Sequence, residues 1–184
     1  MKITEIHIPG LLIIEPDVFA DERGYFFESF HREKYAEKGI HTVFIQDNES
    51  KSGYGVIRGL HYQLDPWAQT KLIRVIKGAV WDVAVDIRKG SPTFGQWYGL
   101  EISAENKKQF FIPKGFAHGF SVLSETAIFS YKCDQYYHKA SERGIAYNDP
   151  ELGVDWKIEA GKALVSAKDQ QHPGLQDAEM NFIF

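Results

Sequence analysis

The sequence predicts a single all-β domain that folds as a barrel. Short runs of β-branched and aromatic residues recur along the 184-residue chain and are separated by turns that contain glycine or proline, a pattern typical of a sandwich or barrel. In the run 81–87, Trp, Val, Val and Ile alternate with Asp82, Ala84 and Asp86, so we expect a strand with one buried and one solvated face. Aromatic residues make up 14% of the chain, which suits a β-rich core or a pocket for flat rings.

The expected strands follow one another with turn signals between them. The clearest turns are residues 21–24, residues 52–55 and Gly78, which joins two strands into a hairpin. The strands are expected at residues 11–14, 25–30, 43–48, 56–63, 71–77, 79–88, 97–103, 109–112, 118–123 and 127–133. Beyond Ser141 the alternation weakens into loops and short helices, so the whole chain, 1–184, reads as one barrel with a decorated C-terminal third.

One short helix is expected near the N-terminus. Residues 25–30 can also be read as the approach to this helix, which would cover residues 31–38. Ser29 is the candidate N-cap, and Gly39 would close the last turn.

Composition excludes several classes of protein. The net charge is −4, with 25 acidic and 21 basic residues, which argues against a broad nucleic-acid surface but allows one small anionic ligand. The only cysteine, Cys133, excludes an internal disulfide and a cysteine-cluster metal site. The chain lacks a signal-peptide pattern and any run of roughly 20 apolar residues. We therefore expect a cytoplasmic protein with no membrane or nucleic-acid partner.

Residues 56–63, V-I-R-G-L-H-Y-Q, place Arg58 and His61 in an otherwise apolar strand. Arginine keeps its charge at any accessible pH, whereas histidine can gain or lose a proton near neutrality. At the mouth of a barrel the pair would supply an anion clamp and a base. A regular strand would aim residues three apart at opposite faces. We therefore predict an irregular backbone between them, for which Gly59 is the natural place.

Two segments that contain histidine resemble the signature regions of the cupin superfamily: H-Y-Q at 61–63 and P-K-G-F-A-H at 113–118. Metal-binding cupins supply two histidines spaced H-x-H and a glutamate from the first region. Gln63 stands where the second histidine would be, and an amide oxygen is a poor ligand for a transition metal. We therefore predict no metal site, and a lone strand histidine could equally be a hydrogen-bonded core residue.

A longer series of motifs resembles one cupin family, the dTDP-4-dehydrorhamnose 3,5-epimerases, from about residue 13 to residue 169. The motifs are D-E-R-G-Y-F-F-E, Q-D-N, V-I-R-G-L-H-Y-Q, T-K-L-I-R-V, G-A-V-W-D-V-A-V-D-I-R, S-P-T-F-G-Q-W, P-K-G-F-A-H-G-F, Y-K-C-D-Q-Y-Y and S-A-K-D. The resemblance implies a jelly-roll barrel, a homodimer, and an isomerase that inverts C3 and C5 of a dTDP-linked 4-keto-6-deoxyhexose in dTDP-L-rhamnose biosynthesis. Proton abstraction next to a ketone needs a base, an acid and a group that stabilises the enolate, so no cofactor is expected.

The resemblance also implies the roles of individual residues. His61 matches the base, Asp169 its carboxylate partner, and Tyr131 the proton donor on the opposite face of the sugar. Lys71 matches the group that steadies the enolate, and His118 a contact to the sugar or its keto oxygen. The ordinary alternatives are a core tyrosine for Tyr131 and a solvated strand edge for Lys71.

A second set of residues matches contacts to the nucleotide. Its arginines and lysine suit phosphate oxygens, its amides and acids suit the thymine edge and sugars, and its tyrosine suits stacking on thymine. The members are Arg23, Arg58, Lys168, Glu28, Gln46, Asn48, Glu142 and Tyr137. Glu28, Glu142 and Lys168 could also be plain surface charges, the commoner case for these residue types.

Four other functions remain open from the sequence. A mono-epimerase acting at C3 or C5 alone would keep the same catalytic residues. A sugar 3,4-ketoisomerase uses a similar barrel, although the R-G-L-H and Y-K-C motifs favour the epimerase. A non-catalytic sugar-binding cupin would not need His61, Asp169 and Tyr131 together, and a metal-dependent cupin would need the ligands that are missing. Residues 11–14 could pair with the sheet of a partner subunit.

Overall fold

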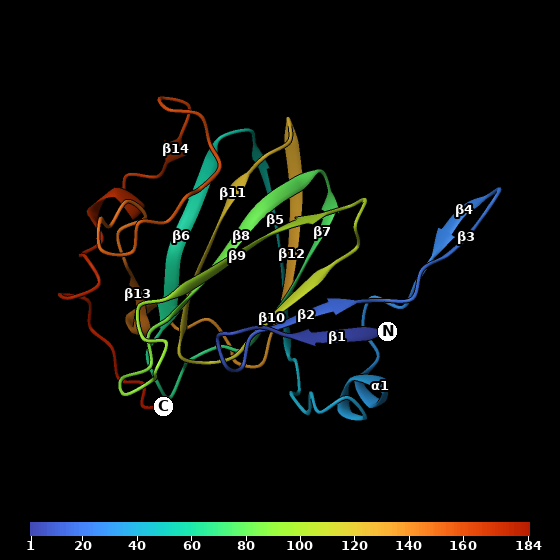
Figure 1. Cartoon of the computed structure of the whole chain (residues 1–184), viewed down its shortest axis with the longest axis horizontal. Coiled ribbons are helices and arrows are strands. Elements are labelled where there is room, and N and C mark those ends of the chain that lie inside the picture. The colour runs from blue at the N-terminus through green and yellow to red at the C-terminus, as the bar shows by residue number, and fades with distance from the viewer.

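The computed structural model describes all 184 residues and shows two facing sheets that form a barrel (Figure 1). One sheet has the order β1 (Lys2–Glu5), β2 (Leu12–Glu15), β10 (Gln109–Ile112), β7 (Lys71–Lys77), β12 (Thr126–Cys133) and β5 (Gln46–Gly53). The other has the order β13 (Glu142–Gly144), β6 (Val56–Gln63), β11 (Phe116–Val122), β8 (Ala79–Asp86) and β9 (Trp97–Ser103), and β14 (Leu164–Val165) pairs with β6. The all-β prediction is confirmed.

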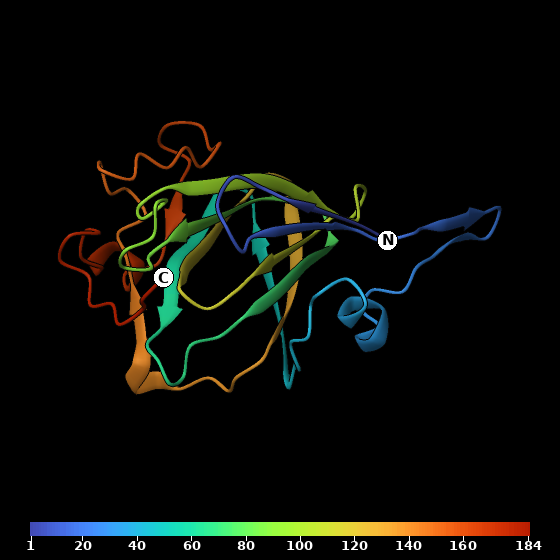
Figure 2. The same ribbon diagram turned by 60° about the horizontal axis from the view of Figure 1, so that its bottom comes forward.

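The remaining elements are small and lie outside the barrel. The hairpin of β3 (Phe19–Asp21) and β4 (Gly24–Phe26) extends away from the body of the molecule (Figures 1 and 2). We call residues 19–26 the arm. The others are helix α1 (Arg32–Ala36) and the 3-10 turns η1 (Lys139–Ser141) and η2 (Asp169–Gln171). None of the helices is long and apolar enough to cross a bilayer.

Most expected strands agree with the structure to within two residues at each end, and two differ by more. The strand expected at 43–48 begins at Gln46 and continues to Gly53, because its whole length pairs with β12. The turn expected at 52–55 is therefore confined to Tyr54 and Gly55. The strand expected at 25–30 ends at Phe26, where its pairing with β3 ends.

Helix α1 forms where it was expected but has a different N-cap. Nδ1 of His31 accepts the backbone N–H of Lys34 at 3.4 Å, so His31 and not Ser29 caps the helix. The carbonyl of Ser29 instead accepts a hydrogen bond from the side chain of Gln109 at 2.8 Å. Gly39, with φ of 88°, ends this region as predicted.

Strand β8 is buried on both faces, so the prediction of a solvated face is wrong. Asp82, Ala84 and Asp86 are 0% exposed, and so are Val83 and Val85 on the other face. Ala84 belongs to the apolar cluster inside the barrel, whereas Val83 and Val85 pack with residues of the C-terminal third. The C-terminal third, which covers the outer face of β8, is distant in sequence. The alternation of residues within one strand cannot show that such a segment packs against it.

Three apolar clusters stabilise this arrangement. The first fills the barrel and includes Ile73, Phe110 and Phe129. The second lies between the outer face of the β6-β11-β8 sheet and the irregular C-terminal chain, which contributes Trp156. The third joins α1, through Tyr35, to the outside of the other sheet. The second cluster holds the C-terminal third, including η2, against β6.

A bulge at Gly59 confirms the predicted irregularity between Arg58 and His61. His118 pairs with His61 and Phe120 pairs with Arg58, so two residues of β6 stand opposite one residue of β11. Gly59 has φ of 132°, a conformation that favours glycine. A Cβ on Gly59 would lie 2.5 Å from the Cα of Gly119, so the two strands approach each other more closely than side chains would allow.

We predict that Gly59→Ala lowers the free energy of unfolding by about 2–5 kcal/mol, because it combines a left-handed φ with overpacking. Gly90→Ala is the matched control: Gly90 also has a positive φ, 87°, but nothing lies within 4 Å of the position that a Cβ would take there. The control should cost only about 1–2 kcal/mol. Urea denaturation of both variants measures the difference, and equal losses would contradict the close approach.

Candidate active site

The bulge turns Arg58 and His61 toward one cavity of about 220 Å³ inside the barrel mouth. Strands from both sheets line it, so the barrel walls bring together residues that are far apart in sequence. Seven of the residues singled out from the sequence line this cavity: Arg58, His61, Lys71, His118, Tyr131, Tyr137 and Glu142. His61 and Tyr131 therefore share one cavity, as a base and an acid acting on the same substrate must.

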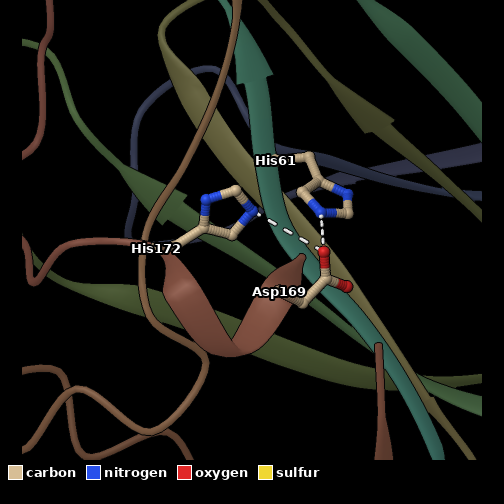
Figure 3. Close-up of side chains that lie close together, drawn as sticks. All are labelled: His61, Asp169 and His172. Carbon is tan, nitrogen blue, oxygen red and sulfur yellow. Dashed lines mark hydrogen bonds and ion pairs between the residues drawn. The ribbon is translucent and has the colours of Figure 1, made fainter. Parts of the chain in front are cut away.

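Asp169 forms the expected pair with His61 (Figure 3). Its Oδ1 lies 2.8 Å from Nε2 of His61, and its Oδ2 accepts the backbone N–H of Gly59 at 3.3 Å. Burial raises the pKa of Asp169, but the hydrogen bonds from His61 and Gly59 outweigh burial and hold the pKa below its ordinary value. The carboxylate therefore stays ionised and accepts a hydrogen bond from Nε2–H of His61, a tautomer that leaves the lone pair of Nδ1 free to accept a proton.

His172 is a third member of this group that the sequence analysis missed. It follows η2, and its Nε2 lies 3.6 Å from Oδ1 of Asp169 (Figure 3). Two histidines and a carboxylate this close together resemble a set of metal ligands, so their spacing can be compared with that of a zinc site. Two ligands of one tetrahedral zinc ion lie about 3.3 Å apart, given metal–ligand bonds of 2.0–2.1 Å. The 2.8 Å contact between His61 and Asp169 is shorter than this and fits a direct hydrogen bond.

Tyr131 and Lys71 lie on neighbouring strands of the opposite sheet. Burial raises the pKa of Tyr131 to about 12, so its phenol keeps its proton at neutral pH and can donate it. The Nζ of Lys71 lies 6.0 Å from the centre of the Tyr131 ring. Loss of water around this ammonium lowers the pKa of Lys71, an effect opposed by the negative forms of Cys133 and Asp82.

His118 is held by a buried carboxylate that the sequence analysis did not assign. Its Nε2 lies 3.0 Å from both carboxylate oxygens of Asp82. Burial lowers the pKa of His118, although Asp82 opposes this. An acid in the middle of an apolar strand, on the face that points into a barrel, was the signal available in the sequence.

Arg58 and Lys71 are the cavity cations that have no carboxylate within ion-pair distance. Arg58 donates only to Oγ of Ser52, at 3.2 Å. By contrast, Lys168 pairs with Glu142 at 2.6 Å at the rim. A cation that stays unpaired in a partly buried cavity favours an anionic ligand, so the cavity is suited to a phosphate group or a developing oxyanion.

Polar side chains organise the rim of the cavity. The hydroxyl of Tyr137 donates to Glu142 at 2.9 Å, and its backbone N–H donates to Oε1 of Gln46 at 3.1 Å. Gln46 in turn donates to Asn48 at 3.0 Å. Tyr137 as a whole residue is 54% exposed, so these contacts hold its backbone while leaving its side chain open to a ligand.

Gln63 has a structural role in the same region. Its amide donates to the carbonyls of Trp67 and Tyr136 and accepts the backbone N–H of His138. This amide therefore ties together the two loops beside the cavity. The hydrogen bonds explain why glutamine suits a position where metal-binding cupins carry a histidine.

Arg23 and Glu28 do not reach the cavity of their own chain. Arg23 lies at the tip of the arm and pairs with Asp21 at 2.6 Å, and Glu28 pairs with Lys34. They line two other hollows, formed by the arm and by its junction with α1. The remaining predicted residues lie in or beside the barrel mouth, so these two are exceptions that the fold of one chain leaves unexplained.

Known proteins resemble the whole chain. A family model described as dTDP-4-dehydrorhamnose 3,5-epimerase matches residues 5–177. The enzyme of that name from Shigella flexneri is 52% identical over 180 residues, which cover 97% of this chain and 98% of the relative. The likeness thus includes the barrel, the arm and η2.

Two solved structures add ligands and a related activity. The crystal structure of the dTDP-6-deoxy-D-glucose-3,5-epimerase from Legionella pneumophila in complex with dTDP-4-keto-L-rhamnose has a TM-score of 0.92 and 53% identity, and covers 96% of this chain and 93% of its own. A 3'-monoepimerase from Streptomyces bikiniensis in complex with dTDP-quinovose has a TM-score of 0.86 and 33% identity, with coverages of 93% and 86%. Both match the two-sheet barrel described above.

We predict that Arg58→Ala weakens the binding of inorganic pyrophosphate by about 10- to 100-fold, the cost of losing a charged hydrogen bond. Arg143→Ala is the control, because Arg143 is paired with Glu179 outside the cavity and its loss should change affinity little. Isothermal titration calorimetry at low salt measures both. Equal effects would mean that the anion binds elsewhere.

Proposed function

Because this chain belongs to the dTDP-4-dehydrorhamnose 3,5-epimerase family, we propose that its barrel cavity holds a dTDP-linked keto-sugar between His61 and Tyr131. The protein is an isomerase of the cupin type, with a jelly-roll barrel. It converts dTDP-4-dehydro-6-deoxy-D-glucose to dTDP-4-dehydro-L-rhamnose, in dTDP-L-rhamnose biosynthesis. The observation that best supports the assignment of residues is one cavity with a carboxylate-bound imidazole, a protonated phenol and two unpaired cations.

The chemistry begins at the ketone of the substrate. The 4-keto group makes the C–H bonds at C3 and C5 acidic, because the electron pair left behind spreads onto the ketone oxygen as an enolate. Nδ1 of His61 takes the proton, and Asp169 stabilises the imidazolium that forms. Lys71, with His118 beside it, supplies positive charge and a donor at the enolate oxygen.

Inversion requires the new proton to arrive on the opposite face of the sugar. Tyr131 gives that proton from its hydroxyl, and its raised pKa keeps the hydroxyl protonated before each step. Afterwards His61 carries one extra proton and Tyr131 lacks one. Solvent restores both groups, so each inverted carbon ends with a hydrogen that came from the enzyme and hence from water.

The nucleotide occupies the rim of the same cavity in this proposal. Arg58 and Lys168 bind the diphosphate, with Lys168 exchanging its pairing with Glu142 for phosphate oxygens. The ring of Tyr137, an exposed residue, stacks on thymine. Gln46 and Asn48, which lie beside Tyr137, contact the base and sugar edges.

The arm suggests that the protein acts as a homodimer. Phe19, Tyr25 and Phe26 are 66%, 59% and 66% exposed, a concentration of aromatic surface that marks an interface. Arg23 and Glu28 lie on or just after this arm, away from their own cavity. In the proposed dimer the arm lies across the partner subunit and brings both residues to the partner's cavity. We place the protein in the cytoplasm, where Cys133 stays reduced.

The main alternative is a mono-epimerase that inverts one carbon. The likeness to the 3'-monoepimerase favours keeping it as the second candidate, because both activities share the barrel. The ketoisomerase, the non-catalytic sugar-binding protein and the metal-dependent cupin gain no such support.

We predict that incubation with dTDP-4-dehydro-6-deoxy-D-glucose in deuterated water places deuterium at both C3 and C5, which NMR detects. Label at one carbon alone would indicate the mono-epimerase, and absence of label would rule out the mechanism. His61→Asn should abolish exchange at both carbons while leaving the Kd for dTDP within about threefold of the wild-type value, because Nδ1 acts on the sugar and not on the nucleotide.

We further predict that Arg23→Ala and His61→Asn, each inactive or weakly active alone, regain about a quarter of wild-type activity after they are unfolded and refolded together in equal amounts. Half of the dimers would then be mixed, and each would contain one intact cavity. Tyr131→Phe mixed with His61→Asn is the control, because both residues belong to one cavity and no intact site can form. No recovery in the first mixture, with dimers confirmed by sedimentation, would place Arg23 in its own subunit's site.

A further inference from the structure

His172 lies beside the pair formed by His61 and Asp169 (Figure 3). It does not line the cavity, and only 13% of its side chain is exposed. Its ring meets the ring of His61 edge-on, with centroids 5.6 Å apart and an interplanar angle of 78° (Figure 3). The chemistry proposed above therefore assigns it no contact with substrate, although it touches both members of the pair.

The backbone around His172 is shaped to admit its ring. Gly144 on β13 pairs with His61 on β6, and a Cβ at Gly144 would lie 2.5 Å from the His172 ring. Asp169 and His172 are three residues apart across one 3-10 turn, so their side chains leave it on the same side. The turn, the glycine and the two rings hold one another in place.

The Nε2 atom of His172 is buried and has no hydrogen-bond partner, and Oδ1 of Asp169 is its nearest carboxylate oxygen, at 3.6 Å. A buried ring nitrogen without a partner costs free energy. In the tautomer with hydrogen on Nε2, this hydrogen faces the carboxylate. In the other tautomer the lone pair of Nε2 would face the negative carboxylate oxygen, which is repulsive. A movement of the carboxylate of about half an ångström would complete the hydrogen bond.

We propose that His172 is a positioning residue: its Nε2–H is a second donor to Oδ1 of Asp169, the oxygen bound to His61, and it limits how strongly the carboxylate holds a proton on His61. This role rests on the proposed function of His61 as the base. A base must be unprotonated to begin each inversion. A carboxylate oxygen whose charge is shared between two donors stabilises the imidazolium less than an oxygen bound by one donor.

Other charged groups surround the rings of His61 and His172. They stay in place when His172 is substituted, so they affect the variants and the wild type alike. His61 shares its surroundings with groups from β6, β7, β11, β12, β13, η2 and the residue before η2: Arg58, Lys71, His118, Tyr131, Glu142, Asp169 and Lys168. Of these, Asp169, Lys168 and Glu142 also act on His172. Burial and the positive form of His61 lower the pKa of His172, so it remains neutral while His61 works.

The test compares three variants with the wild type. His172→Phe keeps a ring over Gly144 but removes the donor, and we expect the acid limb of the kcat/KM profile to move upward by about 0.5–1 pH unit. His172→Gln keeps an N–H and should move the limb by less than half as much. KM should change less than twofold in both, and His41→Gln, at an exposed residue, should leave the profile unchanged.

NMR titration of the His61 ring in the ligand-free variants gives a readout independent of turnover. The midpoint of this titration should move with the acid limb in His172→Phe. An unchanged midpoint, or an equal shift in His172→Gln, would overturn the role of the donor. If the phenylalanine variant does not fold, His172→Leu replaces it. Failure of the wild type to exchange deuterium would instead refute the proposed function. The NMR titrations would still show whether His172 affects the protonation of His61.

Discussion

The carboxylate of Asp169 is the contact on which the candidate site depends. One oxygen accepts from the ring of His61 and the other accepts from the backbone N–H of Gly59. The same glycine forms the bulge that lets Arg58 and His61 enter one cavity. A single buried anion therefore fixes the C-terminal chain to β6 and orients the ring of His61. It also accepts the Gly59 N–H, a donor that the irregular strand leaves outside its ladder.

Most charged groups at the cavity follow one division, and Glu49, an exposed acid on its lining, is the exception without an ion-pair partner. Acids that serve structure or orientation have partners: Asp82 with His118, Asp169 with His61, and Glu142 with Lys168. The cations Arg58 and Lys71 have no acidic partner, and loss of water lowers the pKa of Lys71. An anionic substrate would relieve this imbalance, since Lys71 is partly dehydrated and the exposed Arg58 lines the same cavity, which also contains the neutral phenol of Tyr131.

The barrel supports this chemistry because its walls come from both sheets. Tyr131 and Lys71 lie on β12 and β7, whereas His61 and His118 lie on β6 and β11. Stacked rings of Phe120 and Phe129, 4.1 Å apart, close the cavity from the core. These four side chains of the candidate site therefore stand on strands, which keeps their separation fixed.

The sequence by itself determined the all-β class, most strand positions and the need for an irregularity at Gly59, because alternation, turn residues and the spacing of Arg58 and His61 are local properties. Motif resemblance supplied Asp169, which spacing could not have joined to His61. Only the tertiary structure decided that both faces of β8 are buried, that His172 lies beside Asp169, that Asp82 pairs with His118, and that Arg23 lies away from its own cavity. These features depend on contacts between segments distant in sequence, whose alignment is set by packing and not by any pattern within one strand.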